Sequence, residues 1–409
     1  MKSSRRVNKA HLGVGCFTPT KKAEKYILQV LRSGRLSYGP FIKKFEREFA
    51  KVHGARFAVM VNSGTSALRI AFACLKETEK WKDGDEILVP ATTFVATANT
   101  VLSNGLKPVF VDVDPKTYNI DPEEMRKKIT SRTRGVVPAH LMGLRADMKP
   151  IQALARRHKL KIVEDSCETM FAKYRGVSVG SLGDIGCFST YVAHMIVTGV
   201  GGVALTSNPK YAQILRSLAN HGRDNIYIGM DDSKGKSGKA FEEIIARRFR
   251  FIRPGFSFRV TEFEGALGCA ELESRREIVK KRQHNAHYLI KHLKPLEHLL
   301  QLPSYPPGAD HVFMLFPLVV RKRQGFKKQD LVNFLESRGI ETRDLMPLIN
   351  QPYIRRMFKV RRGDFPVADW LNDCGFYIGC HQSMSEVELD YIVKTFFDFF
   401  KNDGSKVKT

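Results

Sequence analysis

Short apolar runs and helix-like segments alternate through the first part of the chain, and this alternation limits the fold more than any other feature. The apolar runs are β-rich and bounded by Gly, Pro, Asn or Asp: 56–61, 86–90, 108–113, 134–141, 161–166, 185–191 and 202–207. Helix-like segments lie between them at 65–77, 95–105, 121–130 and 149–159. The alternation predicts βαβ units around a mostly parallel sheet, with flanking helices and a ligand site at the carboxyl ends of the strands.

The second half of the chain changes character. With 409 residues, two packed domains are expected. A long charged helix from Glu271 to roughly Leu293 is followed by short strands and helices, which predicts a smaller C-terminal α+β domain. We place the large α/β domain at 14–260 and the small domain at 261–409. The stretch 225–255 is first polar and glycine-bearing and then Arg-rich, and it predicts a mobile insertion followed by a basic helix.

Composition excludes several classes of protein. The chain has neither an apolar leader segment nor a run of 18 apolar residues, so we expect a cytoplasmic protein without a membrane span. The net charge is +25, but the basic residues are spread along the chain and mixed with acidic ones. This pattern favours a solvated basic surface over nucleic-acid binding, and binding of a diphosphate-bearing ligand remains an alternative. The seven cysteines have no C-x-x-C pair, so we expect buried reduced thiols, no metal site and no iron-sulfur cluster.

Polar residues follow three of the predicted strands. After the first, Gly64-Thr65-Ser66 begins a helix, and its amides and hydroxyls would make an anion cradle or simply a capped helix. Phe94 follows the second strand, where it would be a cofactor platform or part of the core. Asp165 ends a later strand, where a buried carboxylate requires a cationic or hydrogen-bonding partner. Glu168, three residues on, would lie near it or cap a helix.

Taken together, these segments resemble the pyridoxal-phosphate fold type I proteins, and specifically the sugar aminotransferase family often called DegT/DnrJ/EryC1/StrS. The blocks that carry the resemblance occur in the family's order at 33–50, 61–68, 89–101, 107–125, 136–143, 163–168, 179–189, 220–223, 255–273 and 351–353. The resemblance implies a homodimer whose active site lies at the subunit interface.

The resemblance also implies roles for individual residues. Gly64 and Thr65, with Ser66 beside them, match the phosphate-binding helix start, and Phe94 matches the aromatic residue that stacks on the cofactor ring. Asp165 matches the acid that pairs with the pyridine nitrogen. The remaining cofactor-binding positions by this resemblance are Glu168, Ser189 and Ser257. Ser257 stands where the family usually has an Asn that reaches the phosphate of the neighbouring subunit.

The main departure from the family is at its lysine. In the family's usual "FSFYPTKN" the seventh residue is the lysine that holds the cofactor covalently; counting the same way through "FSTYVAHM" (188–195) gives His194. There is no lysine between Lys173 and Lys210, so a small shift of register does not supply one. Imidazole does not form a stable covalent link to the cofactor, but it does move protons.

The same replacement occurs in a minority branch of the family, the nucleotide-sugar 3-dehydratases, which include those acting on GDP-4-keto-6-deoxymannose. By resemblance, His194 is an acid/base catalyst, and pyridoxal or pyridoxamine phosphate binds noncovalently. The expected reaction is C3 deoxygenation of a nucleotide-linked 4-keto-6-deoxyhexose, with an amino donor such as glutamate. The alternatives are an aminotransferase-like enzyme that makes an aminosugar, and a noncatalytic sensor of cofactor or sugar nucleotide.

Other polar residues are weaker candidates. His140, which lies in a family block, would be either structural or substrate-contacting. We expect substrate contacts from five residues, each of which also has a structural explanation: His221, Arg223, Arg247, Arg250 and His381. The arginines would bind a diphosphate or lie on a solvated helix face.

Overall fold

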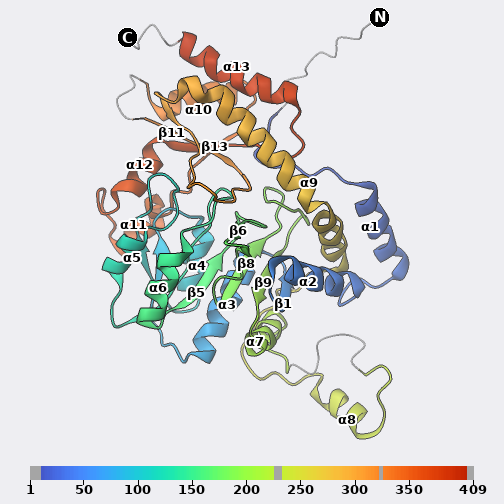
Figure 1. Cartoon of the computed structure of the whole chain (residues 1–409). Helices are drawn as coiled ribbons and strands as arrows, with labels where there is room; N and C mark the ends of the chain where they lie inside the picture. Colours follow the sequence, from blue (N-terminus) through green and yellow to red (C-terminus); the bar gives the residue numbers. More distant parts are fainter. Residues whose placement is uncertain (1–10, 225–232, 322–325, 403–409) are drawn as a thin grey trace, which may run out of the picture.

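A seven-stranded sheet forms the centre of the computed structural model, which describes residues 11–224, 233–321 and 326–402 (Figure 1). Its strands are β1 (Phe57–Val61), β2 (Glu86–Pro90), β3 (Lys107–Val111), β4 (Thr133–Val136), β5 (Lys161–Asp165), β8 (Ile185–Ser189) and β9 (Gly202–Thr206). Their order is β1-β9-β8-β5-β4-β2-β3. The pairs from β8 to β3 are parallel, and β9 is antiparallel to both of its neighbours. The prediction of a mostly parallel sheet is therefore confirmed, although five strands (β3, β4, β5, β8 and β9) end before their predicted last residue.

Helices cover both faces of this sheet because its strands bury alternate side chains on opposite sides. Ile87 and Val89 of β2 pack into one apolar cluster, and Leu88 packs into another. The helices that flank the sheet are α2 (Pro40–His53), α3 (Gly64–Thr78), α4 (Val95–Leu102), α5 (Pro122–Lys128), α6 (Met148–His158) and α7 (Pro209–Ala219). Helix α1 (Lys21–Ser33) and a small hairpin of β6 (Lys173–Tyr174) and β7 (Val177–Ser178) complete this part.

A second, antiparallel sheet of order β10-β11-β13-β12 forms the C-terminal part, as predicted for an α+β unit. Its strands are β10 (Leu300–Gln301), β11 (Phe316–Val320), β12 (Thr342–Asp344) and β13 (Gly375–Ile378). The helical elements around it are η1 (Lys294–Leu296), α10 (Lys328–Ser337), η2 (Leu348–Asn350), α11 (Pro352–Phe358), α12 (Pro366–Cys374) and α13 (Glu386–Asn402). The division at residue 260 stays a prediction.

The long helix α9 (Glu262–Leu293) connects the two parts and begins nine residues earlier than predicted. Thr261 caps it in a capping box with Glu264. The missed turns contain glycines that let α9 lie close to α2: a Cβ on Gly265 would be 2.7 Å from the backbone nitrogen of Ile42. The predicted start at Glu271 was wrong because close packing of small residues, rather than amphipathic periodicity, stabilises these first turns.

Helix α8 (Gly238–Arg247) projects away from the rest of the molecule, at the lower right of Figure 1. None of its residues is buried. The predicted basic helix therefore exists, but it ends at Arg247, and the residues 248–253 continue beyond it. Part of the predicted mobile insertion, 225–232, lies outside the described residues, and its mobility stays a prediction. Across the described ranges there is no helix with both the length and the apolar character needed to span a membrane.

The seven cysteines are free thiols. Four of them are buried, as predicted: Cys74, Cys187, Cys269 and Cys380. Cys16, Cys167 and Cys374 are only partly buried, which corrects the expectation for those three. Cys167 lines the cavity described below.

Candidate active site

A cavity of about 940 Å³ opens where the central strands end. Its lining comes from the loops after β1, β2, β5 and β8 and from the C-terminal part of the chain around β12 and β13. This is the location predicted for a ligand in a parallel sheet. Seven of the predicted site residues line it together: Gly64, Thr65, Phe94, Asp165, Glu168, Ser189 and His194.

The N-terminus of α3 forms one end of the cavity. Ser63 caps the helix by accepting a hydrogen bond from the backbone N–H of Ser66 (3.0 Å). A Cβ on Gly64 would be 2.7 Å from Cys167 Sγ and 2.8 Å from Ser189 Cβ, so only glycine fits between them. Free N–H groups and the helix dipole at this end favour an anion such as a phosphate.

Ser66 and Ser189 differ in their relation to this cradle. Ser189 lies beside Gly64 on the cavity wall. Ser66 does not line the cavity; its hydroxyl donates to the side-chain oxygen of Asn62 at 2.7 Å. Ser66 thus supports the turn before the helix, and direct contact between its side chain and a cofactor stays a prediction.

Phe94 and Asp165 flank the middle of the cavity. Phe94 is the N-cap residue of α4 and is 57% exposed, which is unusual for a large apolar side chain and suits a ring platform. Asp165, at the end of β5, is buried and accepts hydrogen bonds from Thr97 Oγ1 (2.7 Å) and the N–H of Cys167 (3.2 Å). These bonds fix the carboxylate so that it can face a cationic ring nitrogen.

His194 lies on the loop between β8 and β9, and its side chain lines the cavity. Burial lowers the pKa of His194 to about 4, and the positive charge of Arg282 acts in the same direction. Its Nδ1 is buried and makes no hydrogen bond with the described residues. A hydrogen bond to the backbone of Tyr191 raises the pKa in part, but the imidazole is neutral near pH 7 and can act as a base.

Glu168 is a second titratable group in the cavity. It is buried and accepts a hydrogen bond from the N–H of Met142 at 3.1 Å. Burial raises the pKa of Glu168 to about 7, and the charge of Asp165 acts in the same direction. The lining of the cavity therefore includes both a carboxyl group that is partly protonated at neutral pH and a neutral imidazole.

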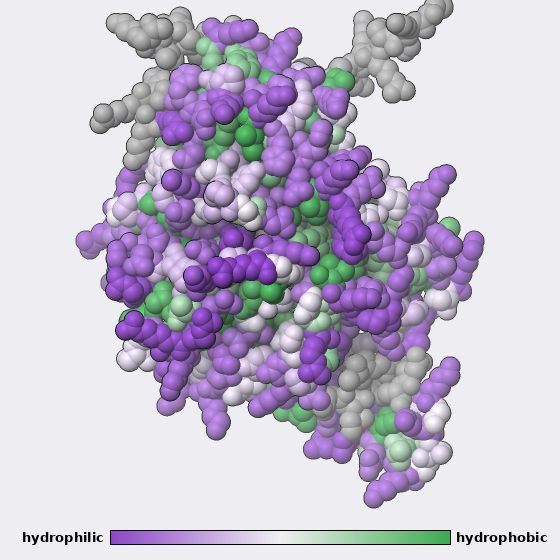
Figure 2. Space-filling model, viewed as in Figure 1, coloured by the Kyte–Doolittle hydropathy of each residue, from purple (hydrophilic) through white to green (hydrophobic). Residues whose placement is uncertain are grey.

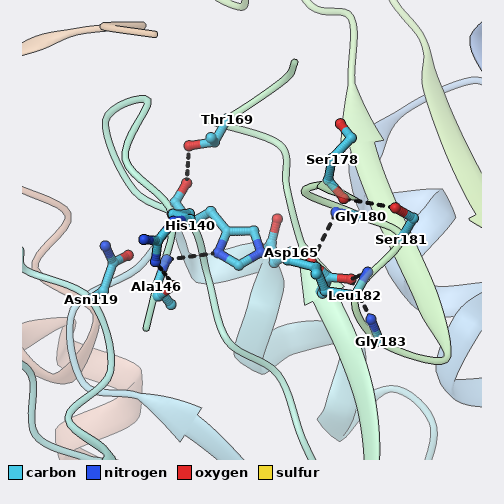
Figure 3. Close-up of polar contacts among 12 residues, drawn as sticks. Asn119, His140, Ala146, Asp165, Thr169, Ser178, Gly180, Ser181, Leu182 and Gly183 are labelled. Carbon is cyan, nitrogen blue, oxygen red and sulfur yellow. Dashed lines mark hydrogen bonds and ion pairs between the residues drawn. The ribbon is translucent and has the colours of Figure 1, made fainter. Parts of the chain in front are cut away.

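His140 also lines the cavity, but its side chain is fully buried and both of its ring nitrogens have partners within the chain. Its Nε2 lies 2.9 Å from Glu164 Oε2, and its Nδ1 accepts a hydrogen bond from the N–H of Ala146 (3.0 Å). Glu164 also accepts three backbone hydrogen bonds, from Gly180, Leu182 and Gly183. Figure 3 shows the imidazole of His140 between Ala146 and the strand that carries Asp165. These contacts favour a structural role for His140 over contact with a substrate.

The other predicted site residues lie outside this cavity within the single chain. Ser257 accepts a hydrogen bond from Arg259 (3.0 Å), and Arg259 also contacts His221 Nε2 (3.1 Å). His381 is buried, and its carbonyl accepts a hydrogen bond from Asn285 (2.8 Å). Arg223, Arg247 and Arg250 lie near or on the projecting segment that contains α8. Their substrate contacts stay predictions.

The C-terminal part adds lining residues that the sequence did not reveal. Arg343 and Glu341 form an ion pair at the cavity wall, with Tyr377 nearby on β13. Gln351 also lines the cavity and was detectable, because it begins the family block at 351–353. The other three carry no local signal, since they approach the sheet only through tertiary packing.

The sequence profile described as the DegT/DnrJ/EryC1/StrS aminotransferase family matches residues 18–397. The chain belongs to this family. Lipopolysaccharide biosynthesis protein RfbH of Salmonella typhimurium is 30% identical, with 93% of this chain and 89% of that protein covered. GDP-perosamine synthase of Caulobacter vibrioides is 31% identical, with 90% and 92% covered.

Solved structures agree with this assignment. The structure of E. coli GDP-4-keto-6-deoxy-D-mannose-3-dehydratase with bound hydrated PLP superposes with a TM-score of 0.85 at 29% sequence identity. The match covers 94% of this chain and 98% of that one. The predicted fold class is therefore confirmed, and the relatives include both a sugar dehydratase and a sugar aminotransferase family member.

Proposed function

We propose that this chain is a nucleotide-sugar 3-dehydratase that uses pyridoxal and pyridoxamine phosphate to remove the C3 hydroxyl of a 4-keto-6-deoxyhexose. The observation that carries the proposal is His194. It stands at the family's lysine position, it lines the cavity, and its buried Nδ1 has no partner among the described residues. The dehydratase at TM-score 0.85 supports this choice.

The residues in the cavity fit the cofactor. Gly64, Thr65 and Ser189 would hold its phosphate at the start of α3. Phe94 would stack on the ring, and Asp165 would pair with the ring nitrogen. When bound, the protonated ring supplies an electron sink for the substrate carbon.

His194 then moves protons without binding the cofactor covalently. Because its pKa is lowered to about 4, the imidazole is a neutral base at pH 7 and would accept the proton that the C4′ carbon of the bound cofactor gives up. It returns that proton to the C3 hydroxyl, which leaves as water. An amino donor such as glutamate would supply the amine nitrogen of the cofactor, and this nitrogen would leave as ammonia. We place this activity in the cytoplasm.

We also propose that the enzyme acts as a homodimer, and the charge of the cavity supports this. Among the described residues that line it, the acids Asp165, Glu168, Glu341 and Asp344 outnumber the single arginine, Arg343, and there is no lysine. A phosphate cofactor and a diphosphate substrate are both anions and need cations nearby. A second subunit would supply them at the mouth of the cavity.

The test is to incubate the purified chain with pyridoxamine phosphate, glutamate and GDP-4-keto-6-deoxymannose, and to follow ammonia and sugar products by mass spectrometry. We expect ammonia and a 3-deoxy-4-keto sugar. His194→Lys is the matched variant: with pyridoxal phosphate it should give a borohydride-fixed adduct, which the parent chain lacks, and it should lose dehydration.

A second candidate function is amino transfer, because GDP-perosamine synthase is a relative of similar identity. Accumulation of an aminosugar without ammonia release would establish this function and contradict the dehydratase. A chain that binds cofactor or sugar nucleotide and converts neither would instead be a sensor.

A further inference from the structure

The loop that carries His194 is attached to the long helix α9 by two charged side chains. The segment between β8 and β9 contains neither a helix nor an extended strand at 194–197. Glu271 and Arg282 of α9 are eleven residues apart, which is about three helical turns, so they lie on the same face of the helix. That face packs against the loop (Figure 1).

The contacts fix both ends of the four-residue segment. Arg282 donates through Nη2 to the carbonyl of His194 (3.4 Å) and through Nη1 to the carbonyl of Met314 (2.7 Å). Glu271 Oε2 accepts a hydrogen bond from the N–H of Val197 (3.3 Å). Arg282 thus joins the catalytic loop to the C-terminal part of the chain, and Glu271 holds the loop three residues further on.

Arg282 has an unusual environment for a cation. Its side chain is fully buried, its Nε makes no hydrogen bond, and no carboxylate in the described part of the chain forms an ion pair with it. Burial of a guanidinium with only carbonyl partners is costly. An apolar side chain of similar length would fill the same space without that cost, so stability alone does not explain an arginine here.

We propose that Arg282 and Glu271 are positioning residues for His194, which fix the loop so that its imidazole is held at the reacting carbon. This inference rests on the proposed function, in which His194 moves protons. The two side chains touch the backbone of the loop and lie outside the lining of the cavity, so they act through His194 rather than on the substrate.

The charge of Arg282 has a second effect on the same histidine. Burial is the main cause of the lowered pKa of His194, and the charge of Arg282 lowers it further; the same two causes lower the pKa of His381. Arginine stays protonated at neutral pH even when burial lowers its pKa, as it does here. The other titratable groups that act on Arg282 from the elements packed around it are Glu271, Cys16 and Cys380.

Two substitutions of Arg282 distinguish its role in positioning His194 from the effect of its charge on the pKa of His194. Arg282→Lys keeps the charge but loses the fork that reaches two carbonyls at once, whereas Arg282→Gln loses the charge and keeps an amide donor. Histidine side-chain NMR of the labelled full chain gives the His194 titration midpoint without substrate, and His194→Asn identifies its signal. Turnover is then measured as kcat and KM across pH.

For Arg282→Lys we expect kcat to fall by about tenfold or more with KM and the His194 midpoint unchanged, because the imidazole is displaced but its electrostatic environment is kept. For Arg282→Gln we expect the midpoint and the acidic limb of kcat to move upward together, since removal of a nearby cation stabilises the charged imidazolium. Glu271→Gln, which keeps an acceptor for Val197, should retain most of the kcat.

Parental kcat in a folded Arg282→Lys variant would overturn the positioning role, and that variant decides the question even if Arg282→Gln does not fold. An unchanged midpoint in folded Arg282→Gln would overturn the charge effect. The NMR midpoint does not depend on activity, so a shifted midpoint in a chain that dehydrates no keto sugar contradicts the proposed function alone.

Discussion

The cavity at the carboxyl ends of the central strands and the projecting segment 233–253 show opposite ways of using charged residues. In the cavity, the carboxylates of Asp165 and Glu168 are buried and have defined backbone or side-chain partners. In the projecting segment, α8 has no buried residue, and Phe249 is 82% exposed. Figure 2 shows apolar side chains exposed where α8 lies, among hydrophilic ones.

The difference shows which part of the site is complete within one chain. The residues proposed to hold a phosphate and a ring and to move a proton line the cavity, but its lining is rich in acids. The projecting segment is rich in arginine, and some of these side chains have intramolecular partners: Arg250 lies 3.7 Å from Asp224, and Arg253 pairs with Glu77. We therefore expect changes in the cavity to affect chemistry and changes in the projecting segment to affect substrate affinity.

His194→Asn should have the largest effect. Asparagine keeps a polar side chain in the cavity but does not exchange protons, so kcat for ammonia release should fall by about 10²- to 10⁴-fold. Cofactor affinity, followed by absorbance, should change little because His194 does not line the α3 cradle. A kcat close to that of the parent chain would contradict the expectation that changes in the cavity affect the chemical step.

Glu168→Gln should change how stability depends on pH. The pKa of Glu168 is raised from 4.5 to about 7 by burial, so between these values the folded chain binds more protons than the unfolded one. The free energy of unfolding contributed by Glu168 therefore falls as the pH rises through this window, by up to about 3 kcal/mol. Urea unfolding from pH 4.5 to 7 should show a flatter decline in Glu168→Gln.

The exposed Glu297 provides the control for that measurement. Glu297→Gln should leave the pH dependence of urea unfolding as in the parent chain. An equally steep decline in Glu168→Gln and the parent would mean that Glu168 is ionised in the folded state and does not act as a partly protonated group in the cavity.

Gly64→Ala should weaken cofactor binding by about tenfold, equal to about 1.4 kcal/mol. The added Cβ would meet Cys167 Sγ at 2.7 Å and force the cradle to open. Titration with pyridoxal phosphate measures the affinity. Ser66→Ala is the matched variant: its hydroxyl faces Asn62, so we expect a loss of about 1 kcal/mol in stability and little change in affinity.

Arg247→Ala combined with Arg250→Ala should have the smallest effect, a several-fold rise in KM for the nucleotide sugar with unchanged kcat, in keeping with lost contacts to phosphate. The double variant Arg156→Ala and Arg157→Ala, on the exposed end of α6, controls for loss of net charge. An equal KM in both would show that the projecting segment does not bind substrate.

Mixed dimers would sharpen this last comparison. A chain with His194→Asn and a chain with both Arg247→Ala and Arg250→Ala are each impaired, but a dimer of the two contains one intact histidine and one intact projecting segment, from different chains. If the projecting segment acts across the interface, mixing the two variants should restore a fraction of activity with low KM. If the mixture shows only the activities of the two separate variants, the projecting segment does not act across the interface.

Much of the fold and part of the site were predictable because their signals are local. Buried strands and amphipathic helices repeat with short periods, and motifs such as Gly64-Thr65 place polar groups at the start of a helix. The start of α9 was not predictable in this way, since Gly265 and Gly268 are stabilised by contact with α2, far away in sequence. Glu341, Arg343 and Tyr377 reach the cavity for the same non-local reason.

The sequence by itself predicted the succession of strands and helices along the chain, the family blocks, and His194 at the position where the family usually has lysine, because each depends on residues that are neighbours in the chain. Only the tertiary structure decided that Ser66 faces the turn, that His140 supports Glu164, and that Arg282 reaches the carbonyl of His194 across 88 positions of sequence. These contacts depend on how distant elements pack, and burial then lowers the pKa of His194, so no local pattern contains them.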